Sequence, residues 1–309
     1  MELSIMIEGQ DGLTWPRWQR LALAAEDFGF AGLYRSDHYT NMNPPEKDSL
    51  ELWVSLTWLA SHTKRIHFGS LVAPFSFRHP SMTARMAAAV DDLSGGRLVL
   101  GLGAGWQVRE HEMFGLDLLE LPERMRRFEE GLEVVTRLLT SETPVDYAGA
   151  HYQLKEAILL PRPQWPGGPR ILVGGNGKQH TLKLAAKYAR EWNGVGLTAD
   201  AYAERVPLLA KYLEQQGRQP SEVKRSVMIR ALFGRTAAEL ASKLAATPFT
   251  ADEWRARGAL VGEAGQLTEQ LAALAAAGCQ QVMLQWIDQD DIAGLEALAA
   301  SVLPQATKF

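Results

Sequence analysis

Residues 94–115, SGGRLVLGLGAGWQVREHEMFG, form the stretch that decides how this chain folds. The stretch begins with a Ser-Gly-Gly turn, continues as an apolar segment over residues 97–102, and ends in the sequence GAGW at residues 103–106. Glycine allows the backbone to bend sharply and to come close to a flat ligand. A glycine run that follows a buried strand therefore predicts the floor of a binding site.

On both sides of this stretch, short apolar segments alternate with segments of helical periodicity. The predicted strands cover residues 3–8, 33–35, 65–71, 97–102, 170–173, 192–197, 223–233 and 281–286. The predicted helices cover residues 15–28, 80–93, 122–139, 178–188, 201–215, 237–244, 252–257, 268–277 and 292–303, and a further helix capped by Asp48 or Ser49 ends near residue 62. Eight strand-then-helix units predict parallel strands joined by helical crossovers, and hence a (β/α)8 TIM barrel of the α/β class.

The length of the chain exceeds what a barrel core needs. Such a core takes ~250 residues, and the chain has 309. We assign the surplus to two insertions, a long loop over residues 104–121 after the fourth strand and a hairpin over residues 143–160 before the fifth. Because no stretch has the composition of a linker, residues 1–309 are predicted to form one domain.

Composition narrows the range of partners. A net charge of -4 provides no basic surface for nucleic acid or for a membrane. The single cysteine, Cys279, cannot form an internal disulfide and suits a reducing compartment. The first residues do not resemble a signal peptide, and no apolar run approaches the ~20 residues that span a bilayer. We therefore expect a cytoplasmic, soluble protein.

The active site of a (β/α)8 barrel lies at the carboxyl ends of its strands. The residues predicted at this end are Glu8, Ser36, Asp37, His38, Ser70, Gly103, Ala104, Gly105, Trp106, Gly174, Gly175, Asn176, Gly177, Lys178, Trp192, Asn193, Arg230, Gln285 and Trp286. Small residues on the third to fifth strands leave room for a planar ring.

The sequence GGNGK at residues 174–178 has the composition of a phosphate site. A glycine-rich loop that enters a helix presents free backbone N–H groups, and the helix dipole adds partial positive charge. If the helix starts at Lys178, that side chain adds a cation. The alternative is that the glycines only close a tight turn. The spacing does not match a nucleotide-binding P-loop.

Asp37 and His38 at the end of the second strand could orient a ring, transfer a proton or bind a metal. No second His or Cys lies at ligand spacing, so no metal is predicted. A histidine with a purely structural hydrogen bond is the alternative. The glycines at positions 101, 103 and 105 lack the following helix that a dinucleotide fingerprint requires. Cys279 follows a helix-ending glycine and is interpreted as structural.

Several motifs together resemble the bacterial luciferase-like family, and most closely its branch of deazaflavin (coenzyme F420)-dependent oxidoreductases. They are SDH at residues 36–38, FRHP at 77–80, MAAA at 86–89, DDLSGGR at 91–97, GLGAGW at 101–106, REH at 109–111, FG at 114–115, GGNGK at 174–178 and EWN at 191–193. These motifs run in order along nearly the whole chain.

The resemblance implies an F420 ring held inside strands two to four, with Asp37 facing the ring and His38 transferring a proton. It also implies a non-prolyl cis peptide after the third strand, at Ser70-Leu71 or Gly69-Ser70, and a homodimer. The residues it assigns to the cofactor are Asp37, Ser70, Leu71, Gly103, Ala104, Gly105, Gly174, Gly175, Asn176, Gly177 and Asn193. The substrate pocket is expected at Glu8, Trp106, Arg230 and Trp286.

The sequence departs from the resemblance at Trp106. Sugar-phosphate dehydrogenases of this branch carry a glutamate near this position, so the resemblance argues against glucose-6-phosphate oxidation. Two alternatives to an F420-dependent oxidoreductase stay open. One is an FMN-dependent monooxygenase on the same barrel, and the other is a non-catalytic protein that binds a flavin or deazaflavin.

Overall fold

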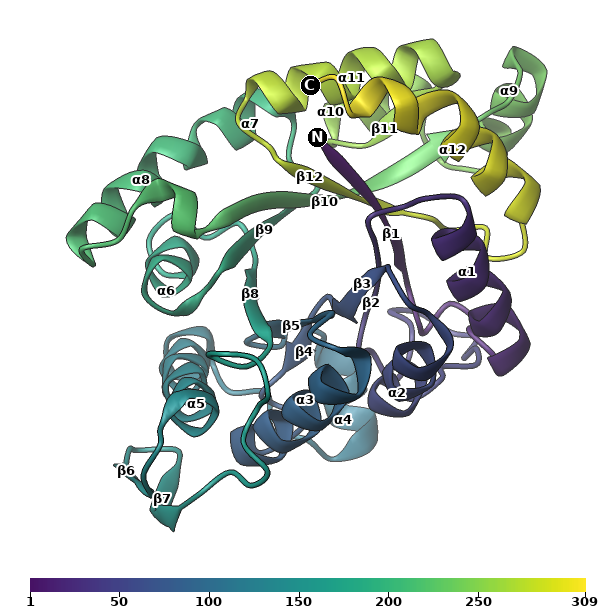
Figure 1. Cartoon of the computed structure of the whole chain (residues 1–309). Helices are drawn as coiled ribbons and strands as arrows, with labels where there is room; N and C mark the ends of the chain where they lie inside the picture. The colour runs from purple at the N-terminus through teal and green to yellow at the C-terminus, as the bar shows by residue number, and fades with distance from the viewer.

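The computed structural model describes residues 1–309, and its centre is a closed barrel of eight parallel strands (Figure 1). In barrel order the strands are β1 (Glu2–Ile7), β2 (Gly32–Arg35), β3 (His67–Ser70), β5 (Leu98–Gly103), β8 (Arg170–Gly174), β9 (Glu191–Val195), β10 (Lys224–Phe233) and β12 (Gln281–Gln285). The register Ser4↔Met283 between β1 and β12 closes the barrel. The predicted (β/α)8 fold is confirmed.

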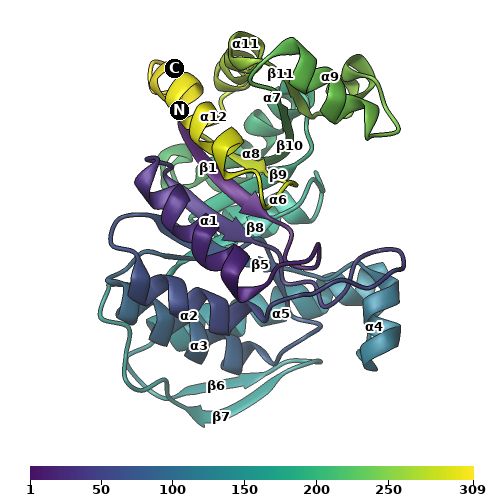
Figure 2. The same ribbon diagram turned by 90° about the vertical axis from the view of Figure 1, so that its right-hand side faces the viewer.

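Helices surround the barrel, and the C-terminal end of α12 lies next to the paired termini (Figure 2). They are α1 (Trp15–Asp27), α2 (Leu52–His62), α3 (Pro80–Ser94), α5 (Leu121–Thr140), α6 (Thr181–Tyr188), α7 (Ala199–Ala203), α8 (Arg205–Gln215), α9 (Ala237–Ala245), α10 (Ala251–Ala256), α11 (Ala264–Ala276) and α12 (Ile292–Ala306). Short strands β4 (Ala73–Pro74) and β11 (Leu260–Gly262) extend the sheet, and the 3-10 helix η1 (Pro220–Glu222) precedes β10. No helix is both long and apolar enough to span a membrane.

Two separate apolar layers hold the barrel together. The larger one packs the helices against the outer faces of the strands, and on α1 it includes the fully buried Trp18 and Leu21. The smaller one fills the barrel interior and consists of Met6, Tyr34, Leu71, Val99, Leu172 and Met283. Because successive side chains on a strand point to opposite faces, each strand supplies both layers.

The stretch at residues 94–115 has a structural half and a functional half. Gly95 ends α3 in the left-handed conformation, with φ 74°, which glycine adopts without strain. Arg97 is buried, and its guanidinium donates to Ala60 O at 2.8 Å and Thr63 O at 2.9 Å, where α2 ends. The first half of the stretch therefore fastens α2 and α3 beneath the barrel.

The second half was predicted as part of a loop, and that prediction is wrong. Residues Val108–Phe114 form a helix, α4. It has only seven residues, too few to produce a helical period in the sequence. Contacts between its polar side chains and the loop after β2 stabilise it instead, as described below. The predicted hairpin before the fifth strand is present as β6 (Val145–Ala148) and β7 (Gln153–Ala157).

Two helix starts also differ from prediction. Helix α2 begins at Leu52 and is capped by Glu51, which accepts from Val54 N–H, instead of by Asp48 or Ser49. Helix α6 begins at Thr181, three residues later than expected, so Lys178 lies outside its first turn. The Asn176 side chain bonds to the backbone of β9, which draws the loop toward that strand before the helix can start.

The predicted helix over residues 201–215 is divided into α7 and α8. Pro207 lacks an N–H to donate to Ala203 O, so the first helix ends there. The cis peptide after the third strand lies at Leu71-Val72, not at Ser70-Leu71 or Gly69-Ser70. Cys279 is buried just before β12, at the end of the barrel away from the carboxyl ends of the strands.

Candidate active site

A cavity of about 430 Å³ opens at the carboxyl ends of the barrel strands. Its lining consists of Met6, Glu8, Ser36, Asp37, His38, Leu71, Val72, Pro74, Gly103, Ala104, Gly105, Trp106, Leu121, Arg124, Met125, Gly174, Gly175, Asn193, Val195 and Met228. A volume of this size is typical of small-molecule and cofactor sites. The apolar floor and the polar rim are contributed by different strands, so the two ends of the cavity differ in chemistry.

The floor of the cavity is the segment at residues 70–72, and glycines on the facing strands make room for it. A Cβ at Gly101 would lie 2.0 Å from Ser70 O, and one at Gly103 would lie 2.4 Å from Val72 Cγ2. A Cβ at Gly174 would lie 2.9 Å from Val72 Cγ1. The space that these glycines leave is therefore occupied by the protein itself. A flat ligand would rest on Leu71 and Val72, and not directly on the glycines as the sequence suggested.

Asp37 lies at one wall of the cavity and is paired with Arg78. The two terminal nitrogens of Arg78 contact the two carboxylate oxygens of Asp37, and Arg78 also reaches Glu51 at 3.0 Å. Burial raises the pKa of Asp37 to about 6, against the opposing effect of the Arg78 charge. The carboxyl can therefore change its protonation state in the physiological range.

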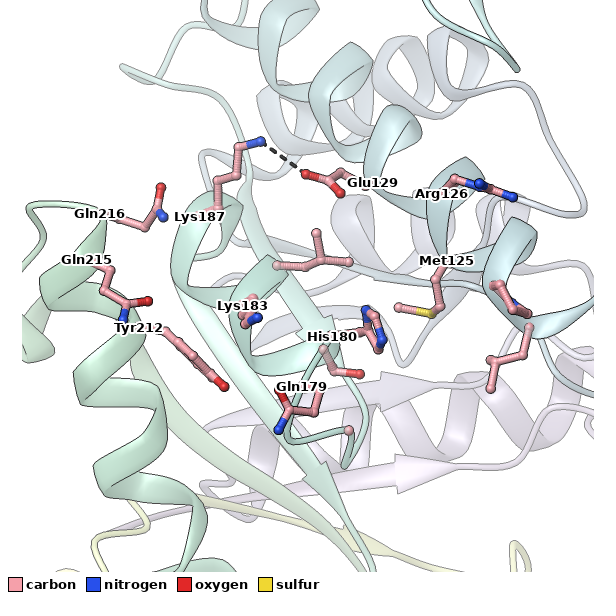
Figure 3. A pocket seen from close by; sticks show the side chains of 15 residues that line it. Met125, Arg126, Glu129, Gln179, His180, Lys183, Lys187, Tyr212, Gln215 and Gln216 are labelled. Atoms are coloured by element: carbon pink, nitrogen blue, oxygen red, sulfur yellow. Dashed lines mark hydrogen bonds and ion pairs between the residues drawn. The ribbon is translucent and has the colours of Figure 1, made fainter.

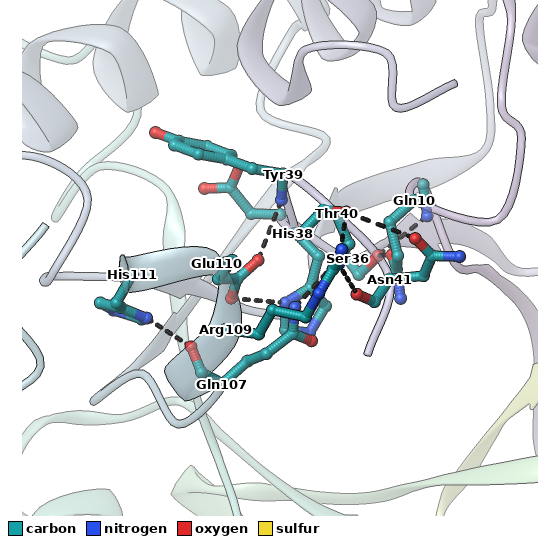
Figure 4. Close-up of polar contacts among 12 residues, drawn as sticks. Gln10, Ser36, His38, Tyr39, Thr40, Asn41, Gln107, Arg109, Glu110 and His111 are labelled. Carbon is teal, nitrogen blue, oxygen red and sulfur yellow. Dashed lines mark hydrogen bonds and ion pairs between the residues drawn. The ribbon is translucent and has the colours of Figure 1, made fainter. Parts of the chain in front are cut away.

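His38 stands next to Asp37 and is held by Glu110 from α4 (Figure 4). Its Nδ1 lies 2.9 Å from Glu110 Oε1, and the other oxygen of Glu110 accepts from Tyr39 N–H at 3.0 Å. Burial by itself would lower the pKa of His38, but the hydrogen bond and charge of Glu110 outweigh it and raise that pKa. The indole of Trp106 meets the imidazole edge to face at 5.5 Å between ring centroids. Nε2 of His38 has no protein partner.

Helix α4 is fastened over the loop after β2 by further polar contacts (Figure 4). Gln107 donates to Thr40 O at 2.8 Å, and Arg109 donates to Asn41 O at 2.8 Å. Glu110, whose carboxylate is buried, directly follows Arg109 in the sequence. Three successive side-chain anchors thus fix the position of Glu110 relative to His38.

The glycine loop after β8 forms the opposite wall. The backbone amides of Asn176, Gly177 and Lys178 donate to no protein acceptor, whereas Gly175 N–H donates to Asn193 O at 2.9 Å. Facing the cavity from the first turn of α5 is Arg124, whose Nε is buried without a hydrogen-bond partner. Free amides and an unpaired guanidinium form a suitable donor set for a phosphate.

Some predicted site residues lie outside the cavity lining. Ser70 is buried and donates to Gly101 O at 2.7 Å, and the Asn176 side chain bonds to Val195. Arg230 stacks on Trp254, and Trp286 is buried in the outer apolar layer with Lys243 over its ring. Lys178, a predicted phosphate ligand, is paired with Glu204 at 2.8 Å. The other predicted residues line the cavity, except Gly177, Trp192 and Gln285.

A larger hollow of about 820 Å³ lies on the outside of the barrel between α5, α6 and α8 (Figure 3). It borders the cavity, since Leu121 and Met125 line both, and it contains Gly177. Its cations include Arg126, Lys183 and Lys187, the last paired with Glu129 at 3.1 Å. Because neither Asp37 nor His38 reaches it, we take the smaller cavity as the candidate active site.

Three residues important to the geometry were not predicted: Arg78, Glu110 and Arg124. The first two lie inside the FRHP and REH motifs. The motifs therefore indicated that these residues matter, but not that they contact Asp37 and His38. Arg124 lies in no motif that was recognised. Its position on the first turn of a helix that follows the glycine-rich strand was the available clue.

Comparison with known proteins identifies the family. A sequence model of the luciferase-like monooxygenases matches residues 3–278, which is most of the chain. The chain belongs to the luciferase-like monooxygenase family. Its motifs at residues 36–38, 101–106 and 174–178 all fall within the matched range.

Similar proteins in this luciferase-like family include F420-dependent enzymes and a monooxygenase. The chain is 29% identical over 214 residues to the F420-dependent glucose-6-phosphate dehydrogenase of Kineococcus radiotolerans, covering 69% of this chain and 62% of the relative. It is 32% identical over 181 residues to the 4-hydroxyprotoasukamycin monooxygenase of Streptomyces nodosus subsp. asukaensis, covering 58% of this chain and 47% of the relative. These alignments span less than two thirds of each relative's length.

Solved structures with this luciferase-like fold align over nearly the whole chain. An F420-dependent secondary alcohol dehydrogenase gives a TM-score of 0.84 at 18% identity, covering 99% of both chains. A long-chain alkane monooxygenase gives a TM-score of 0.83 at 16% identity, covering 100% of this chain and 91% of that one. At such identities the similarity establishes the fold.

Proposed function

We propose that this protein is a coenzyme F420-dependent oxidoreductase that carries out two-electron hydride transfer on a small organic substrate. The observation that carries the proposal is the juxtaposition of His38, held by Glu110, with Asp37 at the rim of a cavity whose floor is apolar. The F420-dependent relative from Kineococcus supports the choice of cofactor.

The residues present fit a deazaflavin that carries a phosphate. Leu71 and Val72 offer an apolar surface to the ring, and Asp37 lies at its edge. The orphaned Nε of Arg124 and the free amides after Gly175 would hold the phosphate. When bound, the coenzyme supplies the hydride chemistry, while the protein contributes position and exclusion of water.

His38 would handle the proton that accompanies the hydride. With Nδ1 engaged by Glu110, the free Nε2 can donate a proton to the carbonyl oxygen of a substrate being reduced, or accept one from a hydroxyl being oxidised. Glu110 is a positioning residue, since it sets the orientation of the imidazole and favours its protonated form. Trp106 would cover the substrate side of His38.

A second candidate function is an FMN-dependent monooxygenase, and the relative from Streptomyces nodosus subsp. asukaensis favours it. Both cofactors combine a tricyclic ring with a phosphate. Titration of the protein with F420 and with FMN, followed by quenching of its nine tryptophans, separates the two proposals. Submicromolar binding of F420 and hydride transfer to or from it are expected. Tight binding of FMN alone would favour the monooxygenase.

We also propose a homodimer located in the cytoplasm. The solvent-facing side of α2 and α3 carries exposed apolar side chains, among them Val54 (56% exposed), Met82 (51%) and Leu93 (52%). Exposed apolar residues grouped on adjacent helices are typical of protein interfaces. The single buried thiol of Cys279 supports a reducing compartment.

A further inference from the structure

Arg230 lies on β10 near the cavity, although it is not among the residues that line it. It lies two residues beyond Met228, which lines the cavity, so both side chains are on the same face of β10. In register with Arg230 on β12 is Gln285, whose amide donates to Glu8 Oε1 at 2.6 Å. Since Glu8 also lines the cavity, Arg230 faces the part of the site that the strands β1, β10 and β12 enclose.

The guanidinium of Arg230 has no ionic partner. No carboxylate lies within 4.0 Å of it, and its Nε is buried without a hydrogen bond. Burial lowers the pKa of Arg230, and the nearest negative charges, Asp11 and Glu8, oppose this effect. Both carboxylates are engaged elsewhere, Asp11 by Lys47 at 3.4 Å and Glu8 by the amides of Gln10 and Gln285.

The orientation of Arg230 is nonetheless fixed. Its guanidinium carbon lies 4.7 Å from the ring centroid of Trp254, at a distance typical of a cation–π contact. A guanidinium stacked on an aromatic ring keeps its N–H groups directed sideways, in the plane of the fork. A half-buried donor without a partner is costly. Such a preorganised and unsatisfied donor is suited to an anionic group of a ligand.

We propose that Arg230 is a specificity-determining residue that binds a carboxylate group of the substrate. This inference rests on the proposed function, in which Arg124 and the glycine loop are occupied by the cofactor phosphate. A carboxylate fits better than a phosphate dianion, because Glu8 and Asp11 add negative charge near Arg230 and a dianion would be repelled more strongly. The preferred substrates are therefore carbonyl or hydroxyl compounds that carry one carboxylate.

The test uses two probes that differ only at this group, 2-oxobutyrate and 2-butanone. Calorimetry measures their binding to the F420-loaded protein and to the cofactor-free protein, and turnover with reduced F420 gives kcat and KM. We expect 2-oxobutyrate to bind at least about 10-fold more tightly than 2-butanone. Arg230→Gln should weaken the binding of 2-oxobutyrate about 10- to 100-fold and raise its KM to the same extent. The affinities for 2-butanone and for F420 should stay unchanged.

Two further variants serve as references. Arg230→Lys should recover part of the affinity, since it keeps the charge but loses the planar fork. Arg137→Gln removes another guanidinium stacked on an aromatic ring, that of Tyr147, far along α5 from the cavity, and should bind both probes like the wild type.

The proposal is overturned if both probes bind equally, if neither binds, or if Arg230→Gln retains the affinity for 2-oxobutyrate. Failure of the proposed function gives a different result. In that case F420 does not bind, whereas the cofactor-free protein still distinguishes 2-oxobutyrate from 2-butanone through Arg230.

Discussion

Nδ1 of His38 lies 2.9 Å from Oε1 of Glu110, although 72 positions separate the two residues in the chain. The histidine follows β2, and the glutamate lies on α4 after β5. Glu110 is almost completely buried, so water does not compete for the contact. This pair sets both the direction of the imidazole and its charge, and the proposed proton transfer depends on it.

Replacing Glu110 by Gln should lower the pKa of His38, because burial then acts without the opposing carboxylate. We expect kcat for hydride transfer to fall about 10- to 100-fold and the pH–rate profile to shift. A proton NMR titration of His38 measures the change in pKa directly. Glu112→Gln, which changes an exposed side chain on the same helix, is the control. It should leave kcat and the pKa of His38 unchanged.

The same pair makes a pH-dependent contribution to stability. Because the pKa of His38 is raised in the folded state, the contribution is complete below the unfolded value of about 6.5 and is lost as the pH rises through the folded pKa. The free energy of unfolding, measured with urea, should therefore differ more between wild type and Glu110→Gln at pH 5.5 than at pH 9. A larger difference at pH 9 would contradict this assignment.

Asp37→Asn should change the pH dependence in the acid range. Burial raises the pKa of Asp37 to about 6 from 3.8, so the folded state binds the proton more tightly and stability falls as the pH rises between these values. As the pH falls from 7 to 3.5, the free energy of unfolding of wild type should rise by about 3 kcal/mol relative to that of the variant. Urea titrations across this range measure the gain, and a constant difference would refute it.

Asp290→Asn provides a control of opposite sign. The hydrogen bond from Arg17 lowers the pKa of the exposed Asp290. Its contribution to stability is therefore present above the unfolded pKa and is lost as the pH falls. Relative to this variant, wild type should lose stability on acidification.

Arg124→Gln should weaken F420 binding about 10- to 100-fold, because the unpaired guanidinium is assigned to the phosphate. The melting temperature should not fall, since the Arg124 side chain has no protein partner to lose. Tryptophan quenching on titration with F420 gives the dissociation constant. Arg126 lies two residues after Arg124 and is paired with Glu123, so Arg126→Gln should bind F420 like wild type. An unchanged affinity of Arg124→Gln for F420 would show that the phosphate binds elsewhere.

Gly103→Ala should destabilise the protein by about 1–3 kcal/mol, because its Cβ would lie 2.4 Å from Val72 Cγ2. Chemical denaturation measures the loss, and Val72→Ala in the same chain should restore most of it if this contact is the cause. Gly265→Ala in α11 meets no atom within 4 Å and should be neutral or slightly stabilising. A Gly103→Ala protein as stable as wild type would show that Val72 shifts to make room for the added methyl group at little energetic cost.

Met82→Glu should dissociate the proposed homodimer. The side chain is 51% exposed on α3, within the apolar group on α2 and α3, and a charge buried at an interface without a partner is costly. Light scattering after size-exclusion chromatography should give a dimer for wild type and a monomer for the variant. Met113→Glu on α4, which is exposed to a similar extent, should remain dimeric. A monomeric wild type would reject the dimer.

The sequence by itself determined the barrel, and it predicted the end of the barrel at which the candidate site lies. Alternating apolar segments predicted the eight strands, because each strand must be buried on both faces inside a ring of helices. Strand-end position then identified Asp37 and His38, which do line the cavity. The fold prediction succeeds because it depends on local periodicity and on the order of elements along the chain.

Only the tertiary structure decided which groups meet. Closure of the barrel brings Arg78 to Asp37 across 41 positions and Glu110 to His38 across 72. It also places Val72 in the space beside Gly103, and leaves the guanidinium groups of Arg124 and Arg230 without a hydrogen-bond or ionic partner. Pairing and its absence are properties of side chains distant in sequence, and neither periodicity nor composition encodes the distances between them.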